Sequence, residues 1–98
     1  MSRLKNITRN VTGTPFVVDM QGMPSGGTIK VIPGSGNTSR VEYSITPSAA
    51  ANPGSSNWST WPSGDVTTTT EDVLTGAVTA LRFTRVSGSS TDVIEVAV

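Results

Sequence analysis

Residues 28–45 read TIKVIPGSGNTSRVEYSI, and the alternation on either side of the PGSGNTS loop sets the fold class. In both flanking runs apolar side chains take every second position, as in a strand with one face against a core. Paired as a hairpin, the two runs set these residues opposite one another: Val31 and Val41, Ile29 and Tyr43, Lys30 and Glu42. Because a slip of one residue would mix the apolar and charged faces, the pattern predicts this register.

The C-terminal quarter shows the same pattern. Residues 79–86 and 91–98 flank the turn SGSS at 87–90. The register that sorts both faces sets these residues opposite one another: Leu81 and Val96, Phe83 and Ile94, Arg82 and Glu95, Arg85 and Asp92. Arg85 shares the apolar face in this pairing, so we expect it and Asp92 at the margin of the sheet, where water keeps the charges hydrated.

Composition extends the β assignment to the whole chain. Twelve valines and fifteen threonines stand beside only three leucines, and these β-branched side chains favour strands. Another alternating run over residues 14–20 puts Phe16, Val18 and Met20 on one face, and a short strand is expected after the β-branched run 66–70. With six to seven short strands and no convincing helix, the chain is predicted to be all-β: one small antiparallel β-sandwich over residues 14–98, Ig-like or jelly-roll-like.

Residues 1–13 are predicted to be an extended N-terminal arm. They carry three basic side chains and no acidic one, and their apolar residues are irregularly spaced. Such an arm either binds an acidic partner or is a solvated terminus. The apolar residues favour binding, and the candidate partner-binding residues are Arg3, Leu4, Lys5, Ile7, Arg9 and Val11. A turn-rich excursion over residues 47–57 is expected to share this contact surface.

Two tryptophans stand three positions apart, at Trp58 and Trp61. If exposed, they would stack on a glycan or anchor a protein interface. Alternatively, one closes the core and the other packs beneath the loop, since a small domain needs its large side chains inside.

The chemistry of the chain argues against an enzyme. It has no histidine and no cysteine, and its seven carboxylates show neither a matched catalytic pair nor a calcium-binding loop. We therefore predict no catalytic residues, no metal ligands and no cofactor. With a net charge of zero, nucleic acid is not an expected partner, and no apolar run is long enough for a signal peptide or a membrane span.

Three stretches carry a resemblance to a known group of proteins: VEYS at 41–44, WSTWPSG at 58–64 and LTGAVTALRFT at 74–84. In these, and in its cysteine-free, Thr/Ser/Gly-rich style, the chain resembles small β-rich virion proteins of tailed bacteriophages. The resemblance implies a virion protein made in the host cytoplasm, in particular a capsid decoration protein bound to the major capsid protein or other virion subunits, as a homo-oligomer. The alternative is a tail-associated adhesin module that binds a host surface glycan.

Overall fold

The strands form where the sequence alternates. A computed structural model of the chain describes residues 6–11, 15–20, 27–74, 76 and 78–97. Its strands are β1 (Asn6–Val11), β2 (Phe16–Asp19), β3 (Gly27–Ile32), β4 (Thr38–Ser44), β5 (Ser59–Thr60), β6 (Thr70–Leu74), β7 (Ala80–Ser87) and β8 (Asp92–Ala97). A turn of 3-10 helix, η1 (Pro53–Ser55), precedes β5. In this part of the chain no helix is long and apolar enough to cross a membrane.

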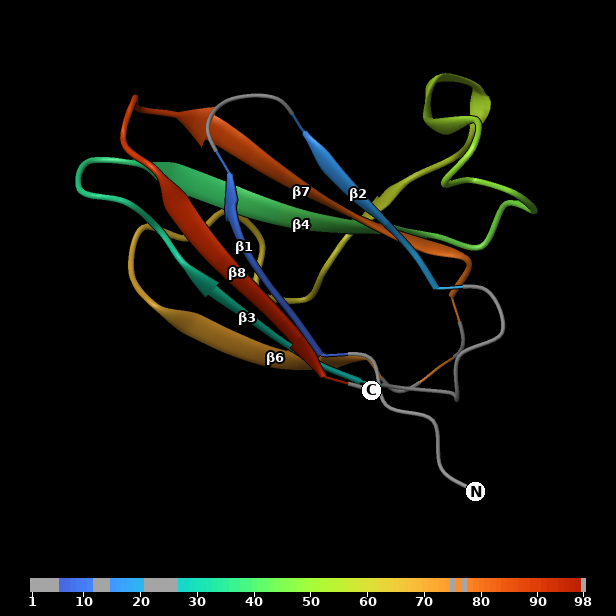
Figure 1. Cartoon of the computed structure of the whole chain (residues 1–98), viewed down its shortest axis with the longest axis horizontal. Helices are drawn as coiled ribbons and strands as arrows, with labels where there is room; N and C mark the ends of the chain where they lie inside the picture. The colour runs from blue at the N-terminus through green and yellow to red at the C-terminus, as the bar shows by residue number, and fades with distance from the viewer. Residues whose placement is uncertain (1–5, 12–14, 21–26, 75, 77, 98) are drawn as a thin grey trace.

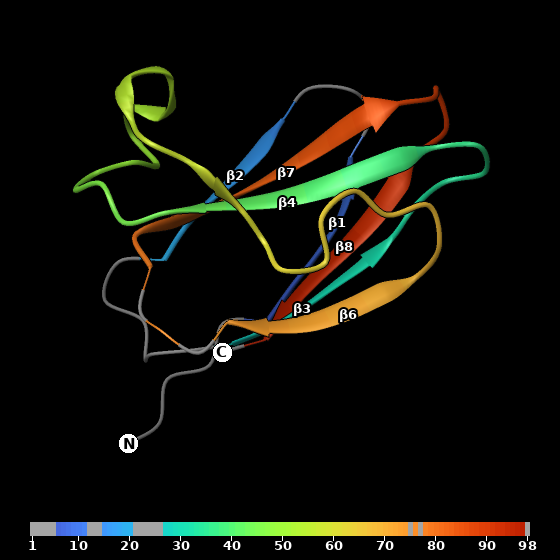
Figure 2. The same ribbon diagram turned by 180° about the vertical axis from the view of Figure 1, so that it is seen from behind.

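Two antiparallel sheets lie face to face, as Figure 1 shows. One has the strand order β1-β8-β3-β6 and the other β2-β7-β4-β5, in which β5 contributes two residues. The view from behind in Figure 2 shows β4 in front of one layer and β6 in front of the other. The predicted all-β sandwich is confirmed.

Both predicted hairpins are wrong, because the strands that flank each loop belong to different sheets. β3 pairs with β6 and β8, whereas β4 pairs with β5 and β7. The loops 33–37 and 88–91 therefore carry the chain across the sandwich instead of reversing it within one sheet.

The charged residues of these strands have exchanged partners. Glu42 lies opposite Arg82, while Lys30 lies between Glu71 and Glu95 in the register of the first sheet. The predicted pairs of Lys30 with Glu42 and of Arg82 with Glu95 are therefore both wrong. In the observed sheets, as in the predicted hairpins, Lys30 and Arg82 each lie opposite an acidic residue. Matching residues across strands therefore cannot decide between the two arrangements.

The apolar residues follow the same exchange. The observed opposite residues are Ile29 and Val96, Val31 and Ile94, Val41 and Phe83, and Tyr43 and Leu81. Phe83 and Ile94, predicted to be neighbours on adjacent strands, belong to facing sheets and line one small cavity between them. Of these predicted inward-facing side chains all but Tyr43 are buried, and Tyr43 is partly buried against the core.

The core lies between the two layers and draws on β2, β3, β4, β7 and β8. Phe16 packs against it and stacks on Phe83 with the ring centroids 6.2 Å apart. Val18 and Met20 are buried, so the predicted inner face of the first alternating run is confirmed. Burying each large apolar side chain contributes roughly 1.5–3 kcal/mol, and in a domain of this size these residues supply most of the stability. The buried cluster consists of Val18, Met20, Ile29, Val31, Val41, Trp61, Val66, Leu81, Phe83, Ile94 and Val96.

Candidate interaction site

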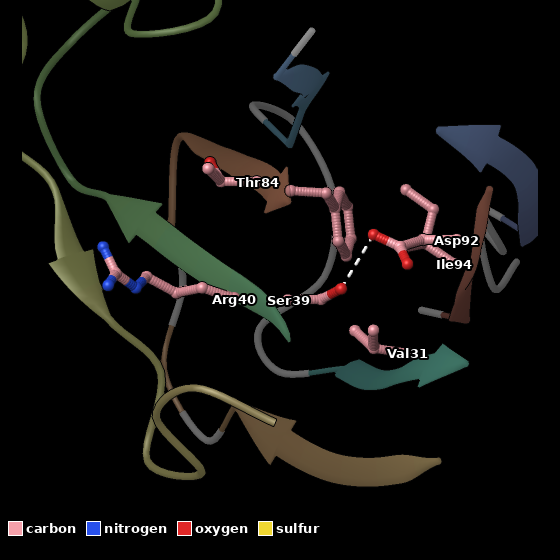
Figure 3. A pocket seen from close by; sticks show the side chains of 7 residues that line it. Val31, Ser39, Arg40, Thr84, Asp92 and Ile94 are labelled. Carbon is pink, nitrogen blue, oxygen red and sulfur yellow. Dashed lines mark hydrogen bonds between the residues drawn. The ribbon is translucent and has the colours of Figure 1, made fainter. Parts of the chain in front are cut away.

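Asp92 joins the two sheets at one end of the sandwich. Its side chain is buried, and its Oδ1 accepts hydrogen bonds from the Gly34 N–H and from Asn37 Nδ2, each at 2.8 Å. Oδ2 accepts a third from Ser39 Oγ at 2.7 Å, as Figure 3 shows. The predicted pairing of Asp92 with Arg85 at a hydrated margin is wrong, because Arg85 donates to the Ser90 carbonyl instead. A buried carboxylate needs such donors; the loop after β3 supplies two of them and β4 of the other sheet supplies the third.

Asn37 fastens the two crossing loops to each other. Its Nδ2 donates to the Ser90 carbonyl at 2.6 Å, and its Oδ1 accepts from the Ser90 N–H at 3.1 Å. The loops are also close-packed: a Cβ on Gly34 would lie 2.5 Å from a backbone carbonyl oxygen. Gly88 has φ +99°, and a Cβ there would clash with Asn37. We name Gly34, Asn37, Ser39, Ser90 and Asp92 the polar interlock, which is a structural device because its hydrogen bonds are made within the protein.

A cavity of about 10 Å³ borders the interlock. Figure 3 shows its lining, which combines apolar core side chains with Ser39, Arg40, Thr84 and Asp92. That volume is about the size that one water molecule needs and far below that of a ligand pocket. This cavity is therefore too small to be a ligand site.

Other carboxylates in the described part of the chain also make contacts that hold the fold. Glu42 accepts from Arg82 Nε at 2.9 Å. Asp65 pairs with Arg40 at 2.6 Å, and this hydrogen bond holds the pKa of the Asp65 carboxyl below its ordinary value of 3.8. The Asp72 carboxylate accepts from Ser63 Oγ and from the N–H of the next residue, and these two bonds, in that order, lower its pKa. Within the described ranges no three acidic residues gather as a metal site.

The two tryptophans have different environments. Trp61 is 2% exposed, lies in the core and donates through Nε1 to the Gly64 carbonyl. Trp58 is half-buried, and Arg82 lies over its ring at 4.4 Å from the centroid. A platform built from both tryptophans does not form. The alternative, in which one tryptophan closes the core, is confirmed for Trp61.

The predicted excursion over residues 47–57 projects from the domain and is held in place by hydrogen bonds. We call it the braced projection. Figure 1 shows it standing out from the end of β4. Trp58 Nε1 donates to the Pro53 carbonyl at 3.0 Å, and the Asn57 N–H donates to Thr46 Oγ1 at 3.1 Å. Near the tip, the Asn52 carbonyl accepts from Ser56 Oγ at 2.7 Å. The chain in this segment is therefore presented in a defined shape at the molecular surface.

An apolar groove opens beside the base of this projection, between the ends of β4 and β6. Its volume is about 250 Å³, below the size of a pocket for a drug-sized ligand but enough for protein side chains. Ile45 is 73% exposed and Val73 is 53% exposed, the two largest exposures among the large apolar side chains in the described ranges. The groove is lined by Tyr43, Ile45, Pro62, Val73, Leu74, Gly76 and Val78. Sequence reasoning missed it, because Ile45 continues the alternation of its strand while β4 ends one residue earlier.

The predicted arm divides into two parts. Ile7, Arg9 and Val11 belong to β1, which forms an edge of the first sheet and runs antiparallel to β8. The remaining predicted binding residues, Arg3, Leu4 and Lys5, lie outside the described residues.

The chain matches no model of a known protein family, and comparison with curated proteins likewise gives no match. The class that the fold defines is a small β-sandwich domain. Its candidate site is a surface: the braced projection together with the apolar groove at its base.

Proposed function

We propose that this protein is a non-enzymatic structural subunit of a tailed-bacteriophage virion, a decoration protein on the capsid surface. The observation that carries the proposal is the braced projection at residues 47–57. This eleven-residue segment is held by side-chain hydrogen bonds at its base and near its tip, so it presents a fixed shape to a partner surface. Because the segment is already ordered in the free protein, binding does not have to order it.

Two further features support the proposal. The stretches that resemble phage virion proteins include the segment with both tryptophans, from which Trp58 braces the projection and Trp61 enters the core. In addition, Glu42, Asp65, Asp72 and Asp92 all make intramolecular contacts that stabilise the sandwich. Side chains committed in this way suit a scaffold that binds through shape and apolar area.

The test is attachment to virus particles. Purified chain is mixed with particles that lack it, and bound protein is measured after sedimentation, together with the copy number on wild-type particles. We expect a copy number comparable to that of the capsid subunit. Ala51→Arg, on an exposed position of the projection, should abolish co-sedimentation, whereas Thr68→Arg, on an exposed loop elsewhere, should not.

Two results would contradict the proposal. If the Ala51→Arg variant bound as well as the wild type, the projection would not be part of the contact surface. A few copies per particle, with binding to host surface glycans that is lost in Trp58→Ala, would favour the adhesin alternative.

A further inference from the structure

The braced projection is longer than its place in the sheet requires. It lies within the connection between β4 and β5, and these two strands pair directly with each other, with Tyr43 opposite Ser59. Two residues suffice to join such strands, whereas the connection here runs over residues 45–58. Connections of this length in a compact domain are usually functional. The additional chain is therefore available for binding.

The backbone of the projection is held in a strained conformation. Ser48 has φ +58°, in the left-handed region that favours glycine, and in the described ranges it is the one non-glycine residue with a positive φ. Its carbonyl accepts hydrogen bonds from the N–H groups of Ala51 and Asn52, each at 3.1 Å, and Ala49 is fully buried. Strain of this kind persists only where surrounding contacts impose it, and it is concentrated at functional sites.

The projection lies in the longest uncharged stretch of the chain. Residues 43–64 are 22 residues without an aspartate, glutamate, lysine or arginine. The acidic residues that bound this stretch are each paired with an arginine, Glu42 with Arg82 and Asp65 with Arg40. The charges at both ends of the stretch are therefore balanced within the protein.

Other charged residues near the base of the projection belong to the sheets. In the second sheet, Asp19 is two strand spacings, about 10 Å, from Ser44 at the end of β4. In the first sheet, Glu71 lies opposite Lys30, and the Asp72 carboxylate accepts a hydrogen bond from a serine hydroxyl. A partner that contacts the tip of the projection need not touch any of them.

The tip presents small side chains. Ala51 and Gly54 are exposed, and a Cβ on Gly54 would meet nothing within 4 Å. The Ser56 hydroxyl donates to the Asn52 carbonyl, so these two polar groups are bonded within the segment. The surface that the projection offers to a partner is therefore uncharged and built from small residues.

We propose that the braced projection binds an uncharged patch of the capsid subunit, so that attachment does not depend on salt. A charged group of the partner buried against the projection would lose its water without gaining a counter-charge. Complementary shape and small apolar groups then supply the contact, without steering by charge. The inference rests on the proposed attachment to a capsid and adds the chemistry of the surface that is bound.

The test is the sedimentation assay with particles that lack the protein, repeated from about 0.05 to about 0.5 M NaCl. The apparent dissociation constant should change by less than about twofold over this range, because salt screens only interactions between charges. Asp19→Asn removes the carboxylate nearest the end of β4 in the second sheet, and this variant should bind as the wild type does.

Substitutions at the exposed Ala51 report on the charge of the partner surface. Ala51→Glu and Ala51→Lys should each weaken binding about tenfold or more, since either charge would be buried without a partner. Ala51→Gln is the matched control, because it has the size of glutamate without the charge, and it should bind more tightly than both. Thermal melting checks that every variant is folded.

The outcomes separate this inference from the proposed function. If the wild type does not co-sediment at any salt concentration, the proposed attachment is wrong and the inference falls with it. If it binds at low salt but about tenfold or more weakly at high salt, attachment stands, the uncharged contact is overturned, and the basic residues predicted for the arm become the contact. Tighter binding by Ala51→Glu or Ala51→Lys than by the wild type, or equal binding by Ala51→Gln and Ala51→Glu, would also overturn it.

Discussion

Removal of the Asp92 carboxylate should be among the most damaging single changes in this protein. Asp92 is 3% exposed and accepts hydrogen bonds from Gly34, Asn37 and Ser39. Asp92→Ala leaves these three donors without an acceptor, and each orphaned buried group costs about 1–3 kcal/mol. Some donors will find water after relaxation, so we expect a loss of about 3–5 kcal/mol. That is a large share of the roughly 5–15 kcal/mol by which a domain is stable.

Asp92→Asn is the matched control because it keeps the shape of the side chain. Its Oδ1 can still accept from Gly34 and Asn37, and its Nδ2 can donate to the Ser39 hydroxyl, which accepts as well as donates. The charge assistance is lost and the Ser39 O–H loses one acceptor, but the other two donors keep theirs, so we expect a smaller cost of about 1–2 kcal/mol.

The assay is equilibrium unfolding in urea, followed by the fluorescence of Trp58 and Trp61 and compared at constant m-value. If Asp92→Ala lowered the free energy of unfolding by less than about 1 kcal/mol, the reasoning would be refuted, because three buried donors without an acceptor should cost more than that. An equal loss for Asp92→Asn and Asp92→Ala would show that the number of satisfied donors does not set the energy.

Three further outcomes follow from the same structure. Gly34→Ala should destabilise the fold by about 1–3 kcal/mol, because its Cβ would meet a backbone oxygen at 2.5 Å, whereas Gly54→Ala, with open space around it, should be nearly neutral in the same urea assay. A double-mutant cycle on Arg82 and Glu42 should show a coupling of about 1 kcal/mol, since the pair is partly buried at 2.9 Å, and no coupling would contradict the observed register. For Asp72, hydrogen bonds from Ser63 and a backbone N–H lower the pKa of the carboxyl in the folded protein. The ionised carboxylate therefore stabilises the fold. This stabilisation is complete above the ordinary pKa of 3.8 and is lost as the pH falls through the lower pKa of the folded state. The stability gap between wild type and Asp72→Asn should therefore hold from neutral pH to about pH 5 and shrink in stronger acid, and a gap independent of pH would contradict this origin.

The inner face of the alternating runs in β2, β3, β4, β7 and β8 was predictable from the sequence alone. Val18, Ile29, Val41, Phe83 and Ile94 were assigned to the inner face and are buried. The physical reason is local: a strand has a period of two, so alternation identifies the buried face without knowledge of any partner.

The candidate site was predictable only in part. The turn-rich composition of residues 47–57 marked the projection, but the brace joins the Trp58 side-chain N–H to the Pro53 main-chain carbonyl, and no spacing reveals that the two are close. The groove joins Ile45 after β4 to Val78 before β7, and its existence depends on where the two sheets end relative to each other.

The choice of strand partners was decided by the tertiary structure alone. Lys30 and Arg82 each have a carboxylate opposite them in the predicted hairpins and in the observed sheets, so cross-strand matching is degenerate. What separates the two arrangements is non-local. Crossing loops bring Asn37 and Asp92 into the polar interlock, and they put Phe83 and Ile94 on facing sheets, where both line one small cavity of the core. The sequence by itself determined that this chain is all-β and which apolar residues of the alternating strands face inward, because those properties arise within each strand. Which strand lies beside which was determined by packing and by the satisfaction of one buried carboxylate, because those energies exist only once both sheets are assembled.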